Sequence, residues 1–140
     1  MVVLIDTNVI LDFLVTREPF YRASAEILSR CAAGELAGYI AFHSVPNLWY
    51  ILRKTPEEKR REWMEDICSF LRVTGAEHEE VVGAIRRKDF PDFEDCLQDK
   101  CAKSAGAEYI ITRNPSDFMN SEVPAVEPEI FLEMLKRQGI

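Results

Sequence analysis

Acidic side chains occur at three places in the chain where their position could bring them together. Asp6 directly follows the apolar run 2–5, and Asp117 comes shortly after the apolar run 110–112. A third group lies in the segment 92–99, whose sequence is DFEDCLQD. Carboxylates that converge in one crevice repel each other strongly unless a proton or a cation lies between them. These positions therefore predict a site that is built to hold a cation.

The segment 92–99 carries the densest acidic pattern. Asp92, Asp95 and Asp99 are spaced i, i+3 and i+7, which predicts that their carboxylates share one face of a helix. The opposite face, predicted to pack on a sheet, consists of Phe93, Leu97, Cys101 and Ser104. The helix dipole favours acids in the first turn, but this does not explain Asp99. A solvated acidic surface is the alternative interpretation.

Oxygen ligands without histidine or cysteine suit Mg²⁺ or Mn²⁺. An ion held by a few carboxylates and several waters can activate a water molecule and bind a phosphodiester. The favoured chemistry is therefore metal-dependent phosphodiester hydrolysis. Each acid also has an ordinary interpretation, since Asp6 could simply cap a helix and Asp117 could be a solvated loop residue.

The elements that position these acids alternate along the chain. Apolar and β-branched runs predict strands over 2–5, 39–42, 71–74, 109–112 and 125–126. Helical periodicity and helix-start signals predict helices from about residue 9, and over 20–33, 46–54, 55–70, 78–87, 93–105 and 128–137. The alternation predicts a three-layer α/β/α sandwich around a central, mostly parallel sheet. Because ligands bind beyond the carboxyl ends of such strands, Asp6, Asn114 and Asp117 should face one crevice.

Two further helix starts have predicted caps. Thr55 is expected to cap the helix that follows it and to form a capping box with Glu58. Ser44 is expected to cap the helix near 46–54.

Composition limits the function classes. The chain has 140 residues and is predicted to be one domain, 1–140. No apolar stretch reaches the roughly 18–20 residues of a membrane span and no secretory signal is evident, so a cytoplasmic location without membrane association is expected. A net charge of −7 argues against binding nucleic acid by charge alone. Nucleic-acid activity would need a metal ion or a local basic patch. The four cysteines have no zinc-ligand spacing and are predicted to be reduced thiols.

Three segments together resemble the PIN domain family, which includes many ribonucleases and the VapC-type toxins of toxin–antitoxin pairs. They are VLIDTNVILDFL near the N-terminus, DFEDCLQ, and AEYIITRNPSDF towards the C-terminus. Their order and spacing span nearly the whole chain. The resemblance implies a PIN-like fold and a metal-dependent ribonuclease.

The resemblance also implies roles for individual residues. It implies that Asp6, Asp95 and Asp117 are the catalytic acids that bind the metal, with help from Asp92. Asp117 would replace an acid that the family commonly has where Asn114 stands. The family often carries a glutamate where Asn47 stands. Two amides in place of acids would weaken the metal site and leave the fold intact. The residues predicted to support the site are Thr7, Asn8, Asn47, Asp92, Asp99, Thr112, Arg113 and Asn114.

Basic side chains have two interpretations. Those in 53–54, 59–61 and 86–88 could contact an RNA backbone, but residues 59–61 are better explained as a solvated helix surface paired with nearby glutamates. Arg113 lies in the predicted crevice loop, where it could hold a phosphate or neutralise the carboxylates.

Two alternative functions remain open. A PIN-like module that has lost catalysis would bind RNA or a protein without metal-stimulated cleavage, as the amides at 47 and 114 suggest. A phosphatase of the haloacid-dehalogenase type would use Asp6 as nucleophile, although Asn8 stands where that chemistry needs an acid. The partners that the resemblance implies are an RNA substrate, an antitoxin protein and a second copy of the chain in a homodimer.

Overall fold

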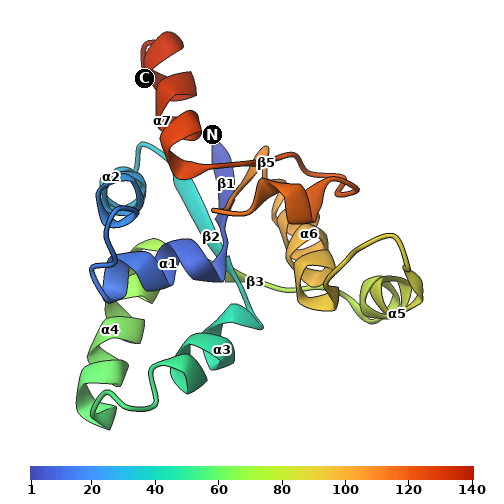
Figure 1. Cartoon of the computed structure of the whole chain (residues 1–140), viewed down its shortest axis with the longest axis horizontal. Helices are drawn as coiled ribbons and strands as arrows, with labels where there is room; N and C mark the ends of the chain where they lie inside the picture. Colours follow the sequence, from blue (N-terminus) through green and yellow to red (C-terminus); the bar gives the residue numbers. More distant parts are fainter.

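Five short strands form an all-parallel sheet in the order β3-β2-β1-β4-β5 in the computed structural model, which describes residues 1–140 (Figure 1). The strands are β1 (Val2–Ile5), β2 (Ala37–Ala41), β3 (Arg72–Thr74), β4 (Tyr109–Ile111) and β5 (Ala125–Val126). The helices are α1 (Thr7–Leu14), α2 (Tyr21–Ala32), α3 (Ser44–Ile51), α4 (Glu57–Phe70), α5 (His78–Arg86), α6 (Phe93–Ala105), the 3₁₀ helix η1 (Pro115–Phe118) and α7 (Pro128–Arg137).

Alternate residues of the strands face two separate apolar cores. Val3 and Ile5 pack with α1, α2, α4 and α7, whereas Leu4 packs with α5 and α6 on the other face. On β4, Ile111 belongs to the first of these cores and Ile110 to the second. Figure 1 shows α1, α2 and α4 on one side of the sheet and α5 and α6 on the other. The predicted three-layer α/β/α architecture is confirmed.

Close packing of α2 on the sheet depends on one glycine. A Cβ atom at Gly38 on β2 would lie 2.6 Å from both Cys31 Sγ and Leu71 Cδ2. Cys31 is buried in the first core, and all four cysteines are free thiols, as predicted. Any larger residue at position 38 would push α2 and the end of α4 away from the sheet.

Strand register brings the ends of β1 and β4 together. Ile5 pairs with Ile111, so the next residues, Asp6 and Thr112, leave the sheet side by side. The Asp6 backbone N–H donates to the Ile111 carbonyl at 2.9 Å, which extends the ladder to the point where the chain turns into α1. The register therefore places Asp6 against the loop that follows β4.

Some local predictions were wrong. Thr55 forms no capping box, because α4 begins at Glu57 with Pro56 at its cap and no side-chain cap bond. A capping box occurs instead at α5, between Glu77 and Glu80. Ser44 lies inside α3, where it is fully buried. The segment after Asn114, predicted as a loop, forms η1.

The predicted faces of α6 also need correction. Phe93 and Ser104 are exposed, while Cys96, Gln98, Asp99, Cys101 and Ala102 are buried. Asp99 therefore faces the protein interior and not the same surface as Asp92. The reason is that Asp99 is satisfied by backbone donors of a later loop, which spacing within the helix cannot reveal.

No helix has the length and apolar character that a bilayer crossing requires.

Candidate active site

Asp6 caps α1 and is held in place from both sides. Its Oδ1 accepts a hydrogen bond from the Thr7 backbone N–H at 2.7 Å, and its Oδ2 accepts from the Thr112 hydroxyl at 2.8 Å. The Thr112 hydroxyl in turn accepts from the Asn114 backbone N–H at 3.2 Å, which orients its proton toward Asp6. The helix-cap interpretation is therefore correct, and it leaves Asp6 fixed at the edge of a cavity.

Burial sets the ionisation of Asp6. Only 7% of the residue is exposed, and this desolvation raises the pKa of its carboxyl above the ordinary value. The hydrogen bonds from Thr112 and Thr7 oppose the shift, while the negative charge of Asp117 adds to it. A nearby cation would stabilise the charged form that burial disfavours.

Asp95 projects from the first turn of α6 into the same cavity. Its pKa is raised to about 7, first by burial and then by the negative charges of Asp6, Asp92, Asp117 and Glu94. The carboxylates of three separate segments thus act on one another, as the sequence predicted. At neutral pH this group is poised between its protonated and ionised forms.

The cavity between α1, α3 and α6 has a volume of about 380 Å³. Its lining residues are Asp6, Thr7, Asn8, Leu11, Asn47, Tyr50, Ile51, Glu94, Asp95 and Gln98. Glu94 was not predicted as a site residue, although it belongs to the same DFED motif. Its Oε2 accepts a hydrogen bond from Asn47 Nδ2 at 3.4 Å, so an acid from α6 reaches the amide of α3.

A polar network at the wall of the cavity joins the three helices. The Thr7 and Ser44 hydroxyls lie 2.7 Å apart, and Gln98 Nε2 donates to Ser44 Oγ at 2.8 Å. Gln98 and Ser44 are both buried. Neither was predicted from the sequence, because the contacts join residues 37 and 54 positions apart. The network fixes α1, α3 and α6 relative to one another, and with them Asp6 at the start of α1 and Asp95 on α6.

The other predicted acids, Asp92, Asp117 and Asp99, do not line the cavity. Asp92 caps α6, where its Oδ1 accepts from the backbone N–H groups of Glu94 and Asp95. Asp117, half-buried in η1, lies outside the cavity lining but raises the pKa of both Asp6 and Asp95. Asp99 accepts from the backbone N–H groups of Glu122 and Val123, each at 3.0 Å, and so anchors the segment before β5.

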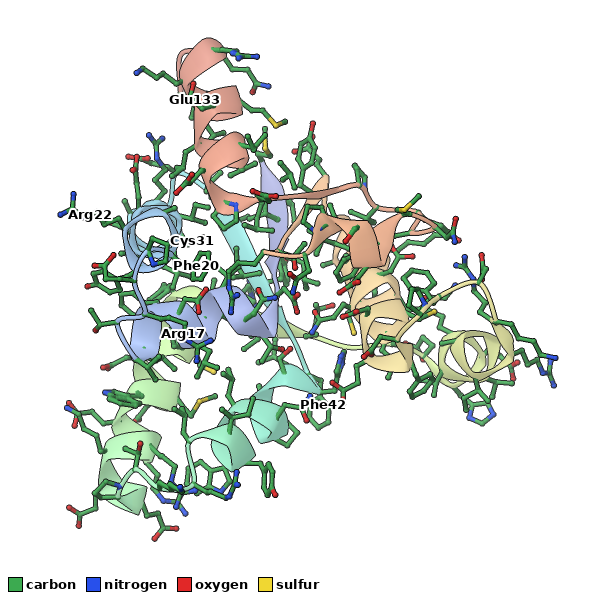
Figure 2. The ribbon with its side chains drawn as sticks, in the orientation of Figure 1. Arg17, Phe20, Arg22, Cys31, Phe42 and Glu133 are labelled. Carbon is green, nitrogen blue, oxygen red and sulfur yellow. The ribbon has the colours of Figure 1, made fainter.

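The loop after β4 is anchored to α1. Arg113 pairs with the fully buried Asp12, and its guanidinium lies 4.3 Å from the ring centroid of Phe20. Arg17 is a second cation near Asp12. Arg17 and Phe20, both labelled in Figure 2, belong to the turn between α1 and α2. Asn8 Oδ1 accepts from the Arg113 backbone N–H at 3.4 Å. Arg113 therefore pairs directly with Asp12, and its positive charge also lowers the pKa of Asp6, in line with the interpretation that it neutralises carboxylates. Asn114 is exposed.

The donor set fits a hard divalent cation. The cavity presents carboxylate and amide oxygens, and no histidine or cysteine. No three acidic, histidine or cysteine side chains are arranged as a complete ligand set. An ion bound by Asp6 and Asp95 would therefore keep several of its waters, which is how Mg²⁺ commonly binds.

Known proteins are similar to this chain in sequence and in fold. One curated relative, Ribonuclease VapC1 from Aquifex aeolicus (strain VF5), is 25% identical over 135 residues, which cover 94% of this chain and 93% of the relative. The fold is similar to that of VapBC2 from Rickettsia felis, solved bound to a DNA fragment from their promoter, with a TM-score of 0.66 and 16% identity over 91% of this chain and 98% of the other. It is also similar to PAE2754 from Pyrobaculum aerophilum, with a TM-score of 0.62 and 17% identity over 97% and 90% of the two chains.

A family model is more decisive than these pairwise similarities. The model for the PIN domain matches residues 2–116, which include Asp6, Asp95 and Asn114. This match confirms the resemblance that the three sequence segments indicated. The chain belongs to the PIN domain family.

Proposed function

We propose that this chain is a metal-dependent endoribonuclease whose active site is the cavity between α1, α3 and α6. The observation that carries the proposal is the convergence of Asp6 and Asp95 on this cavity, with the pKa of Asp95 raised to about 7 by burial and by neighbouring carboxylates. Similarity to a ribonuclease along nearly the whole chain supports RNA as the substrate.

Asp6 and Asp95 would hold the ion, which is Mg²⁺ or Mn²⁺, and Asp117 would add negative charge nearby. A divalent ion bound there would lower the pKa of a bound water molecule and offset the negative charge of the phosphodiester. The chain supplies the rest. Thr112 and the Thr7 backbone hold Asp6 in one orientation. The Thr7–Ser44–Gln98 network keeps α1, α3 and α6 in fixed relative positions.

Glu94 compensates in part for the missing acid at position 47. Its carboxylate lies at Asn47, so the cavity keeps an acid on the side of α3. The negative charge that α3 lacks at position 47 is thus supplied by Glu94 of α6. On this view the two amides weaken the site without abolishing it.

The test is cleavage of a labelled RNA pool by the purified chain with Mg²⁺, with Mn²⁺ and with EDTA. Cleavage should require the metal and fall by at least about a hundredfold in Asp6→Asn and Asp95→Asn. Asp66→Asn is the matched control, because Asp66 is an exposed acid on α4 that does not line the cavity. Equal rates in the wild-type chain and in both site variants would refute the mechanism.

A binding module without catalysis is the second candidate. It is favoured by the exposed Asn114, which brings no carboxylate to the cavity, and by the lack of a complete three-acid ligand set. Such a protein would bind RNA or a protein partner and show no metal-stimulated cleavage. The haloacid-dehalogenase alternative is set aside by the family match, and Asn8 is engaged by the backbone of Arg113.

The toxin of a toxin–antitoxin pair is the biological setting that we propose. Similarity to VapBC2 of Rickettsia felis and to Ribonuclease VapC1 supports it. In that setting the partner would be an antitoxin protein, and the chain would form a homodimer in the cytoplasm. Size-exclusion chromatography with light scattering would test the dimer.

A further inference from the structure

The corner between α3 and α4 is basic in an otherwise acidic chain. Residues 53–61 contain five cationic and two acidic side chains, a net charge of +3, whereas the whole chain has −7. Figure 1 shows this corner at the opposite end of the molecule from α7. We call residues 53–61 together with Tyr50 the α3–α4 corner.

The cations of this corner are of two kinds. Arg61 pairs with Glu57 at 3.1 Å and Lys59 with Glu62 at 3.7 Å, as expected of a solvated helix surface. Arg53, Lys54 and Arg60 have no carboxylate within 4.0 Å. Arg53 and Arg60 instead donate to backbone carbonyls of Tyr50 and Trp49 and lie over aromatic rings.

Tyr50 connects the corner to the active-site cavity. It lines the cavity, yet 64% of the residue is exposed to solvent. The Arg53 guanidinium lies 4.3 Å from the centroid of its ring, which holds the ring in place while leaving much of it open. An exposed aromatic ring beside unpaired cations is the combination that binds single-stranded nucleic acid, because a base stacks on the ring and phosphates contact the cations.

We propose that the α3–α4 corner is a binding surface for single-stranded RNA that leads into the cavity, an inference that rests on the function proposed above. An unpaired base stacks on Tyr50, and flanking phosphates contact Arg53, Lys54 and Arg60. The corner supplies the attraction that the acidic cavity cannot, since the carboxylates of Asp6, Asp95 and Glu94 repel a phosphate backbone. Duplex RNA is disfavoured because its paired bases are not free to stack on a side chain.

The test separates binding from cleavage by placing every chain in an Asp95→Asn background with Mg²⁺ present. Affinity for a fluorescein-labelled 12-nucleotide single strand is measured by anisotropy at several salt concentrations. Tyr50→Ala should weaken binding at least about fivefold, and Tyr50→Phe should retain the parent affinity because it keeps the ring. Arg53→Gln/Lys54→Gln should weaken binding and reduce the salt slope by about 1.4, the value for two phosphate contacts on a single strand.

A matched control is Lys136→Gln/Arg137→Gln on α7, which removes the same charge at the far end of the molecule. Its affinity and salt slope should equal those of the parent apart from a small uniform effect of net charge. Equal losses in both double variants, or no loss in either, would overturn the proposal and assign the unpaired cations to another polyanion, such as an acidic protein segment. So would undiminished affinity in Tyr50→Ala.

These results are independent of the catalytic test. If the wild-type chain fails to cleave RNA but the corner variants lose affinity, the binding surface stands and the nuclease proposal fails. If the wild-type chain cleaves and the corner variants bind unchanged, the nuclease proposal stands and the surface fails.

Discussion

Arg113 Nε lies 2.6 Å from the Oδ2 atom of Asp12, a residue that is fully buried inside α1. Arg17 provides a second, more distant cation at 3.5 Å. The ion pair ties the loop that follows β4 to the helix that follows β1. Because Thr112 precedes Arg113 directly, the pair also fixes the hydroxyl that bonds to Asp6.

Removal of Arg113 should therefore destabilise the fold. Arg113→Ala leaves Asp12 buried with only the distant Arg17, and such a loss typically costs about 3 kcal/mol in the free energy of unfolding. Urea denaturation followed by circular dichroism measures it. Arg113→Lys keeps the charge and should recover part of the loss. Equal stability of Arg113→Ala and the wild-type chain would mean that the pair does not anchor the loop.

Thr112 should affect the charge of Asp6 more than the stability of the chain. Its hydroxyl lowers the pKa of Asp6 against the effect of burial, so Thr112→Val should raise that pKa further. Mn²⁺ affinity at pH 7 should then fall about tenfold, as measured by calorimetry. Thr112→Ser retains the hydroxyl and should bind Mn²⁺ as the wild-type chain does. If valine and serine behave alike, the hydrogen bond does not tune the site.

Asp95 makes the metal-free protein less stable as the pH rises. Its carboxyl has a pKa of about 7 in the folded chain against an ordinary value of 3.8, so between these pH values the folded state binds more protons than the unfolded state. The free energy of unfolding therefore falls from about pH 4 to about pH 7 and then levels off.

Asp95→Asn should remove most of this slope. The variant should be more stable than the wild-type chain above pH 7 in EDTA, and the difference should vanish near pH 4. Denaturation across this pH range tests it, with Asp66→Asn as control. An unchanged slope in Asp95→Asn would show that burial and the neighbouring carboxylates do not raise the pKa of Asp95.

Glu94 should contribute to the affinity for metal. Glu94→Gln preserves the shape of the side chain and its contact with Asn47 but removes one negative charge from the cavity. Calorimetry should show Mn²⁺ binding weakened about three- to tenfold, a smaller loss than in Asp95→Asn. Glu108→Gln, an exposed glutamate between α6 and β4, is the control. Unchanged affinity would leave the missing acid at position 47 uncompensated.

The strands and most helices could be predicted because local signals agree with the final packing. Val2–Ile5, Phe93–Ala105 and Pro128–Arg137 have the predicted bounds. The capping of α4 could not be predicted, because Pro56 takes the cap position and the dipole is satisfied by Glu57 and Glu58. The sequence favoured a single domain, and this stays a prediction.

The parts of the site that could be predicted are those at the ends of neighbouring parallel strands. Asp6 and Thr112 meet because β1 and β4 are neighbours, a consequence of the α/β topology. Glu94, Ser44 and Gln98 were missed because their contacts depend on how α3 and α6 pack. The ion pair between Arg113 and Asp12 was also missed, because nothing in the sequence marks Asp12 as its buried partner.

The central claim is that Asp6 and Asp95 together bind the divalent ion that RNA cleavage requires. Calorimetric titration of the wild-type chain and of Asp95→Asn with Mn²⁺ at pH 7.5 tests it most directly. The account predicts saturable binding by the wild-type chain that Asp95→Asn loses or weakens at least about a hundredfold, with folding retained. Binding of equal strength in both chains, or no binding by the wild-type chain at millimolar Mn²⁺, would contradict it.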